Sequence, residues 1–269
     1  LFLSVPMSAL KGYIWRCARG DIMMKKAVEI KNLSFIYPDG NHALFDITLD
    51  VGEGESVGVI GPNGAGKSTL LLHLNGLLNE DSNIKIFDKP ITRENITFIR
   101  KKVAFVFQDP QDQLFMPTAY EDVAFGPLNL GLNQEEVDER VNYALSEVGL
   151  LDKKNHSSHH LSLGQQRRLS LATVLAMSPE ILVLDEPNSN LDHSSRRHLI
   201  NLLKNFNITK IIATHDLEMV LELCSRVFLL DSGMIVREGK AREILSDTAL
   251  LQAHGLEVPL SILSKRQPF

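Results

Sequence analysis

The segment at residues 61–69 constrains the fold of this chain more than any other. It fits the pattern G-x-x-x-x-G-K-[ST], and it consists of Gly61, Pro62, Asn63, Gly64, Ala65, Gly66, Lys67, Ser68 and Thr69. Such a loop needs a buried strand before it and a helix after it. The apolar runs at residues 55–60 and 69–74 meet both requirements. A chance glycine-rich turn before a helix would not explain the strand, the loop, the Lys67-Ser68 pair and the helix together. We therefore expect an α/β fold built around a phosphate-binding loop.

The residue types of this phosphate loop suit a triphosphate. Glycines permit positive φ, so consecutive backbone N–H groups can turn inward around an anion. The start of the following helix adds unpaired N–H groups and the positive end of its dipole. Lys67 supplies a point charge for the β- and γ-phosphates, and the hydroxyl of Ser68 suits Mg²⁺. The chain is therefore expected to bind a nucleoside triphosphate with magnesium.

Composition narrows the alternatives. The 269 residues, 44% of them hydrophobic, suffice for one large α/β domain or for a domain with a smaller companion. A net charge of -5 argues against a dedicated nucleic-acid binder. The two cysteines, Cys17 and Cys224, suggest reduced thiols in a cytosolic setting rather than a disulfide framework. No apolar run has the length of a membrane span, so work at a membrane would go through a partner.

The two ends of the chain differ from its middle. Residues 1–22 are predicted to be a disordered leader or an over-extended start, with the working protein beginning near Met23 or Met24. A nucleotide-binding domain is expected over residues 23–245. Residues 246–269 form a tail in which we identify no chemistry.

A small antiparallel sheet is predicted ahead of the phosphate loop. Residues 28–37 alternate as a half-buried strand does, and residues 43–51 form its neighbour. Tyr37 then lies at the tip of this sheet, where it could stack on a purine ring or simply be a partly buried strand aromatic. Further on, the apolar stripe at residues 135–149 predicts a helix within an α-helical insertion at about residues 114–170.

Polar side chains follow three predicted buried strands. Gln108 follows residues 103–107, and His215 follows residues 210–214. Open α/β sheets place ligand-binding residues at the carboxyl ends of their strands. Gln108 could therefore ligate Mg²⁺ or position water, or it could be solvated. His215 could contact the γ-phosphate, or it could be structural.

The third strand, at residues 181–184, ends in two acidic residues. Asp185 is placed to hold Mg²⁺ through water, and Glu186 is placed to activate an attacking water as general base. The alternative is a surface turn with solvated charges. Carboxylates at the end of a buried strand are costly unless they are used, which favours the catalytic interpretation.

Two further segments leave alternatives open. The sequence LSLGQQRR begins a helix at residues 161–168, in which Ser162 could be an N-cap or part of a second anion site. The histidines of residues 152–160 suggest a metal site, but no carboxylate or cysteine with ligand spacing accompanies them. We favour a solvated linker for this segment.

Taken together, these motifs stand in the order found in the ATP-binding-cassette ATPases. The sequence closely resembles that family from about Val28 to about Ile244. The resemblance implies a P-loop NTPase (RecA-like) α/β core with an N-terminal antiparallel β-subdomain and an inserted α-helical signature subdomain. It also implies head-to-tail dimers that hold ATP between the phosphate loop of one chain and the signature segment, residues 161–165, of the other.

The resemblance also implies roles for single residues. Ser162, Gly164 and Gln165 would grip the γ-phosphate bound by the opposite chain, and Tyr37 would stack on adenine. Gln108 would couple Mg²⁺ to the partner interface, and Asp192 would lie at the dimer contact. Leu163 departs from the family, which usually has glycine at that position, and its Cβ limits the approach of the backbone.

A narrower resemblance concerns residues 90–95, 106–118 and 121–132. These segments are similar to the ATPase subunits of energy-coupling-factor importers, most of all those for cobalt and nickel. The resemblance implies an ATP-hydrolysing homodimer at the cytoplasmic face of the cell membrane, peripheral to it. It would act beneath a transmembrane coupling subunit and a membrane substrate-capture subunit, with no nucleic-acid partner. The segment after Gln108 would line the groove that receives the coupling helices.

Three rival functions remain. The nearest is the ATPase of a vitamin importer of the same class, which is often built from two unlike ATPase subunits. A soluble cassette protein acting on DNA or ribosomes usually carries two cassettes or long coiled-coil insertions, and this chain has neither. A P-loop kinase would leave the signature segment and His215 without a shared explanation.

Overall fold

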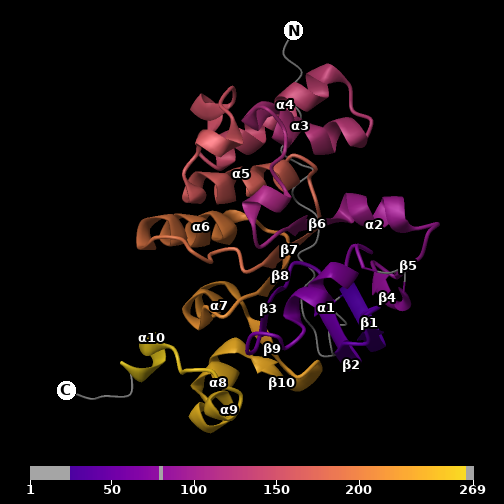
Figure 1. Ribbon diagram of the computed structural model, residues 1–269, viewed down its shortest axis with the longest axis vertical. Coiled ribbons are helices and arrows are strands. Elements are labelled where there is room, and N and C mark those ends of the chain that lie inside the picture. Colours follow the sequence, from indigo (N-terminus) through magenta and orange to yellow (C-terminus); the bar gives the residue numbers. More distant parts are fainter. Residues whose placement is uncertain (1–24, 79–80, 265–269) are drawn as a thin grey trace, which may run out of the picture.

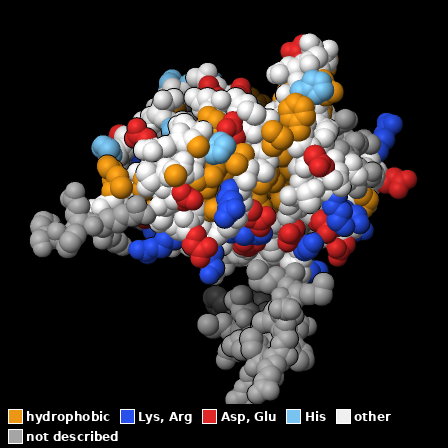
Figure 2. Space-filling model, turned by 90° about the horizontal axis from the view of Figure 1, so that it is seen from below, with side chains coloured by type: hydrophobic (Ala, Val, Ile, Leu, Met, Phe, Trp, Pro, Cys, Tyr) orange, Lys and Arg blue, Asp and Glu red, His pale blue; other side chains and the backbone are white. Residues whose placement is uncertain are grey.

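The computed structural model describes residues 25–78 and 81–264, which form two sheets, the helices around them and a helical subdomain (Figure 1). The leader predicted at residues 1–22 lies outside the described residues. Lys, Arg, Asp and Glu side chains are mixed on the face in Figure 2, so neither sign of charge dominates that face.

The larger sheet is six-stranded, in the order β10-β9-β3-β8-β7-β6. Its strands are parallel except at one edge, where β9 and β10 form an antiparallel hairpin. Side chains of β7 alternate between two cores: Ile181 and Val183 pack on one face, and Leu182 and Leu184 on the other. Burial on both faces explains the continuous apolar runs. The strands are β3 (Ser56–Ile60), β6 (Val103–Val106), β7 (Ile181–Asp185), β8 (Thr209–Ala213), β9 (Arg226–Asp231) and β10 (Met234–Lys240).

The smaller sheet is antiparallel and confirms the pairing predicted near the start of the domain. Its order is β2-β1-β4-β5, and Ile30 of β1 lies opposite Leu49 of β2. Its apolar side chains share one core with the parallel sheet and with the helix after the phosphate loop. The strands are β1 (Lys26–Ile36), β2 (His42–Gly52), β4 (Asp81–Ile86) and β5 (Lys89–Ile91).

Helices cover both faces of the parallel sheet. On the side of the small sheet lies α1 (Lys67–His73), and α2 (Ile96–Lys102) leads into β6. The opposite face packs against α6 (His193–Asn205), α7 (Leu217–Leu223) and the C-terminal helices. These last are α8 (Ala241–Ser246), α9 (Thr248–Ala253) and α10 (Leu260–Leu263).

The helical insertion forms a subdomain at one end of the molecule (Figure 1). It consists of α3 (Ala119–Asn129), α4 (Gln134–Glu147) and α5 (Leu163–Leu175), which pack on one another. The predicted helix at residues 135–149 is confirmed as α4, which a capping box of Asn133 and Glu136 begins.

The connection at residues 152–160 is more ordered than a solvated linker. Its three histidines are exposed, as expected, but Ser158 is buried and the segment contains two short 3₁₀ turns. The backbone N–H groups of Ala119 and Tyr120 donate to its carbonyls. The connection therefore fixes the start of α3.

Candidate functional site

A pocket of about 850 Å³ opens at the carboxyl edge of the parallel sheet. The structure brings most of the predicted site residues to its walls: Tyr37, all of residues 61–69, Gln108, Glu186 and His215. The signature residues Ser162, Gly164 and Gln165 do not line it. One chain therefore contributes one set of predicted ligand groups to this pocket and leaves the other set elsewhere.

Glycine is required at two positions of the phosphate loop. Gly61 has φ 150°, and a Cβ there would lie 1.9 Å from the carbonyl oxygen of Leu230. Gly66 has φ 100°, and its Cβ would lie 2.7 Å from the carbonyl oxygen of Ala43. The loop can approach its neighbours this closely only because both side chains are missing.

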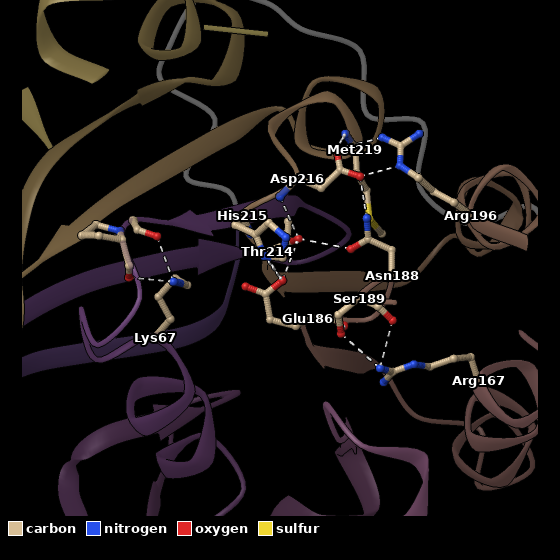
Figure 3. Close-up of polar contacts among 12 residues, drawn as sticks. Lys67, Arg167, Glu186, Asn188, Ser189, Arg196, Thr214, His215, Asp216 and Met219 are labelled. Carbon is tan, nitrogen blue, oxygen red and sulfur yellow. Dashed lines mark hydrogen bonds and ion pairs between the residues drawn. The ribbon is translucent and has the colours of Figure 1, made fainter. Parts of the chain in front are cut away.

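Lys67 is held inside the loop that it follows. Its Nζ donates to the carbonyl oxygens of Gly61 and Pro62, each at 2.9 Å, and the side chain is buried (Figure 3). Burial lowers the pKa of Lys67, and the nearby carboxylates of Glu186 and Asp185 oppose that shift. The ammonium group is therefore positioned at the pocket by main-chain acceptors, independently of any ion pair.

Asp185 lies at the end of β7, hydrogen-bonded to Ser68. Burial raises the pKa of this carboxyl group, and the bond from Ser68 partly offsets the rise. Its Oδ1 is buried and has no hydrogen-bond partner among the described residues. A buried carboxylate oxygen that lacks a donor, next to a hydroxyl, is a donor set that suits Mg²⁺. Ser68, Asp185 and the nearby pocket residue Gln108 thus fit a magnesium ion.

Glu186 is fixed on both its backbone and its side chain (Figure 3). Its φ of 43° is unusual for a residue with a side chain, and its N–H donates to the carbonyl oxygen of Ala213. The carboxylate oxygen Oε2 lies 2.8 Å from Nδ1 of His215 and 3.2 Å from Oγ1 of Thr214. The strained turn therefore points this carboxylate into the pocket, in a defined orientation.

Arg167 is a buried residue of α5 that the sequence interpretation missed. Its guanidinium donates to the carbonyl oxygens of Phe107 and Ser189 and to the Ser189 hydroxyl, at 3.1 to 3.3 Å. The same hydroxyl donates to the carbonyl oxygen of Glu186 at 2.8 Å. Arg167 thus connects the signature helix, the strand end before Gln108 and the turn of Glu186. The one available signal was a charged residue on the inner face of an apolar-periodic helix.

The signature segment, residues 161–165, is exposed at Ser162 and Leu163, half-buried at Gly164 and Gln165 and buried at Leu161. Ser162 and Gln165 form a reciprocal capping box at the start of α5, so the capping interpretation of Ser162 is confirmed. Ser162 and Leu163 are exposed. A Cβ at Gly164 would lie 2.5 Å from Oγ of Ser195, because the start of α6 packs against this turn. Asp192 caps α6 through the N–H of Ser195.

Tyr37 is a partly buried aromatic directly after β1, and it lines the pocket. It is half-buried, and its hydroxyl lies 3.0 Å from Oγ1 of Thr69 at the start of α1. Its ring packs edge-on against Phe35, with the centroids 4.9 Å apart. The tyrosine is thus a strand aromatic whose position on the pocket wall is fixed.

The tail also reaches the pocket, which corrects the expectation that it carries no identifiable chemistry. Gly255 and Leu256 line the wall, and Nδ1 of His254 lies 2.6 Å from Oδ2 of Asp231. The hydrogen bond from His254 lowers the pKa of Asp231. Asp231 precedes a turn whose Gly233 donates to the carbonyl oxygen of Ala65. No local pattern in the tail indicated this contact.

The described ranges, 25–78 and 81–264, lack both a metal-binding cluster and a membrane-spanning helix. They contain no cluster of three or more His, Cys, Asp or Glu residues that could hold a metal ion, the histidines of residues 152–160 included. Nor does any helix in the same ranges have the length and apolarity needed to cross a membrane.

Comparisons with known proteins agree with this geometry. Residues 44–189 match the family model described as ABC transporter. The chain is 49% identical over 243 residues to the energy-coupling factor transporter ATP-binding protein EcfA of Carboxydothermus hydrogenoformans, covering 89% of this chain and 90% of the relative. It is 46% identical over 238 residues to the EcfA of Methanothermobacter thermautotrophicus, covering 86% and 76%.

Solved structures give the same result. The structure of cbiO1 from Clostridium perfringens, described as part of the ABC transporter complex cbiONQ, matches with a TM-score of 0.76 at 35% identity, over 90% of this chain and all of that one. The ATP-binding cassette MJ0796, in a dimeric post-hydrolysis state bound to ADP and Pi, matches with a TM-score of 0.70 at 32% identity, over 80% and 99%. The chain therefore belongs to the ABC transporter family, as an ATP-binding subunit that hydrolyses ATP.

Proposed function

We propose that this chain is the ATPase subunit of an energy-coupling-factor importer for cobalt or nickel ions, working as a homodimer on the cytoplasmic face of the cell membrane. The EcfA relatives support the energy-coupling-factor class, and the match to cbiO1, part of the ABC transporter complex cbiONQ, supports an ATPase that works within a transporter complex. The choice of cobalt or nickel rests on the resemblance of residues 90–95, 106–118 and 121–132. Residues 23–245 would be the ATPase domain, with the helical subdomain at about residues 114–170.

The observation that carries the proposal is an exposed apolar surface on the helical subdomain and the loop before α3. Phe115, Phe125 and Leu128 are 59%, 43% and 51% exposed, and the two phenylalanine rings pack edge to face with centroids 5.1 Å apart. We call these three residues the docking patch. Contiguous exposed apolar side chains mark sites of interaction with proteins or membranes. Phe115 lies in the segment that follows the pocket residue Gln108, which is the segment expected to receive the coupling helices.

A buried carboxylate holds the docking patch in place. Oδ1 of Asp122 accepts from the N–H groups of Phe115 and Met116, each at 2.9 Å. Burial raises the pKa of Asp122, and these two bonds oppose the rise. The loop that presents Phe115 is therefore fixed to α3 before any partner arrives, which reduces the entropy cost of docking.

Within the pocket we assign roles as follows. Tyr37 stacks on adenine, the N–H groups of the phosphate loop hold the phosphates, and Lys67 adds its charge to the β- and γ-phosphates. Glu186 accepts the proton of the water that attacks the γ-phosphorus, and His215 contacts the γ-phosphate. Mg²⁺, held by Ser68, Asp185 and Gln108, would neutralise charge on the β- and γ-oxygens.

The signature segment supplies the argument for a dimer. Ser162, Gly164 and Gln165 sit at an exposed helix start and do not line the pocket of their own chain. A second copy would place them against the γ-phosphate of the first. ATP then binds the closed dimer better than the open one, and that difference in affinity drives closure. The matched MJ0796 cassette is dimeric.

Co-purification with a transmembrane coupling subunit and a membrane substrate-capture subunit from the same genome tests the proposal. Phe115→Ser and Phe125→Ser should abolish co-purification and ATP-driven uptake of cobalt or nickel ions into membrane vesicles. Val236→Ser, at a 40% exposed position on β10, is the matched control and should change neither. Vitamin uptake without metal uptake would show that the substrate assignment is wrong. A Glu186→Gln chain that stays monomeric with ATP and magnesium would show that the dimer is wrong.

A further inference from the structure

Thr214 is a buried residue to which no role has yet been given. It lies between β8 and His215 and is fully buried. Its Oγ1 lies 3.2 Å from Oε2 of Glu186 and also 3.2 Å from Oδ1 of Asn188 (Figure 3). A hydroxyl carries one proton, so it can donate to only one of these two acceptors at a time. The N–H of Asp216 donates to the same oxygen, at 3.1 Å, and fixes its position.

The orientation of the Asn188 amide follows from its other contact. Its Nδ2 donates to Oδ2 of Asp216 at 2.5 Å, and since a carboxylate accepts, the amide oxygen must face Thr214. Asp216 is in turn held by Arg196 of α6, at 2.5 and 2.8 Å. The buried Asn188 therefore competes with the carboxylate of Glu186 for one proton, and its position depends on α6.

We propose that Thr214 is a positioning residue that anchors Oε2 of Glu186, and that Asn188 limits this anchoring by competing for the hydroxyl proton. With Oε2 held by Thr214 and His215, the other carboxylate oxygen is left to face the water that attacks ATP. The inference rests on Glu186 being the base, as assigned above. Through Asn188, α6, which begins directly after Asp192, would also influence the base. Movement of Arg196 on dimer closure would displace the amide of Asn188 that competes for the proton.

Substitution of the hydroxyl tests the anchor. Thr214→Val keeps the shape but removes the donor, and it should lower the kcat of ATP hydrolysis by about tenfold or more, the usual factor for a lost hydrogen bond to a charged group. ATP affinity should stay within about twofold, because Thr214 does not line the pocket. Thr214→Ser keeps the hydroxyl and should recover most of the rate. The buried Thr209, at the opposite end of β8, offers the matched control Thr209→Val, which should leave kcat unchanged.

Substitution of the competitor should act in the opposite direction. Asn188→Leu leaves the proton to Glu186, so kcat should rise, by at most about twofold because two acceptors at equal distance share the proton. Arg196 and the N–H of Met219 still hold Asp216 in this variant. In the double variant with Thr214→Val the gain should vanish, because Asn188 acts through Thr214.

Three outcomes would overturn the inference. They are a Thr214→Ser variant as slow as Thr214→Val, an Asn188→Leu variant as slow as Thr214→Val, and an ATP affinity that falls in step with kcat. Each would indicate a packing role, and thermal unfolding of every variant shows whether the fold is intact. Glu186→Gln separates this inference from the assignment on which it rests. If that variant hydrolyses ATP normally, the assigned base is wrong. If it is slow while Thr214→Val is normal, only the anchor is wrong.

Discussion

The phosphate loop and the signature segment are both glycine-containing turns that begin a helix, yet they differ in what surrounds them. The phosphate loop packs against β2, β9 and the turn at Gly233, and it keeps Lys67 on its own carbonyls. The signature segment caps only its own helix and turns Ser162 and Leu163 to the surface. The first is thus a complete binding element within one chain. In the proposed dimer the second is half of a site and gains its function from a second copy.

The largest expected effect concerns the pocket that the phosphate loop lines, where it separates ATP hydrolysis from ATP binding. Glu186→Gln should lower the rate of ATP hydrolysis by roughly 10²–10⁴, the usual contribution of a general base, while ATP affinity is kept. Phosphate release and equilibrium nucleotide binding, measured on the same preparation, check both parts. Normal turnover would remove Glu186 from the mechanism.

Loss of the loop ammonium should be the next largest effect. Lys67→Ala removes a buried donor for the phosphates and should weaken ATP binding by about 10- to 100-fold, the range for hydrogen bonds to charged groups. Equilibrium titration with ATP is the measurement. Lys210→Ala is a matched control, because Lys210 is also buried and bonded to main-chain carbonyls but does not line the pocket. Equal affinities in the two variants would contradict the role given to Lys67.

A change at the signature turn should affect assembly but not binding by the single chain. Gly164→Ala places a methyl group against Ser195, and we expect overpacking to cost about 1–3 kcal/mol and to reduce the ATP-dependent dimer. Light scattering with ATP in the Glu186→Gln background measures the dimer. Ser195→Gly in the same chain should restore it, since it removes the contacting atoms. If the variant instead weakened ATP binding by the monomer, it would contradict the distinction drawn between the phosphate loop and the signature segment.

The smallest effect is expected at Leu163, which is 38% exposed. Leu163→Gly removes the side chain that limits the approach of a second copy and should tighten the closed dimer by a few-fold. Part of the gain is offset, because glycine weakens the start of α5. The dimer dissociation constant with ATP, compared with that of Leu163→Ala, decides the matter. A weaker dimer in both variants would mean that Leu163 itself contacts the partner.

Local patterns were enough to predict the sheet and one wall of the pocket. The runs at residues 181–184 and 211–213 are continuous and apolar because these strands are buried on both faces, and the residues that follow them had to meet at one edge. Strand direction alone therefore predicts that Glu186 and His215 lie at the same edge. The capping box of Ser162 and Gln165 is likewise a pattern of neighbours in sequence.

Contacts between distant segments could not be predicted in this way. Arg167 meets Phe107 and Ser189 only because α5 packs over the strand ends. Thr214 resembles any strand threonine until Asn188 is placed beside it. Such pairs are set by tertiary packing, and the hydrophobic periodicity of the sequence does not encode them.

The tail has a consequence for how the folded chain resists unfolding. Tyr37, near the start of the domain, and Leu256, in the tail that follows it, line the same pocket. A nucleotide bound there would touch both, so fraying of either end would release ligand and lose its binding free energy. Bound ATP would thus couple the first strand to the last helices, so that both segments unfold in a single cooperative transition.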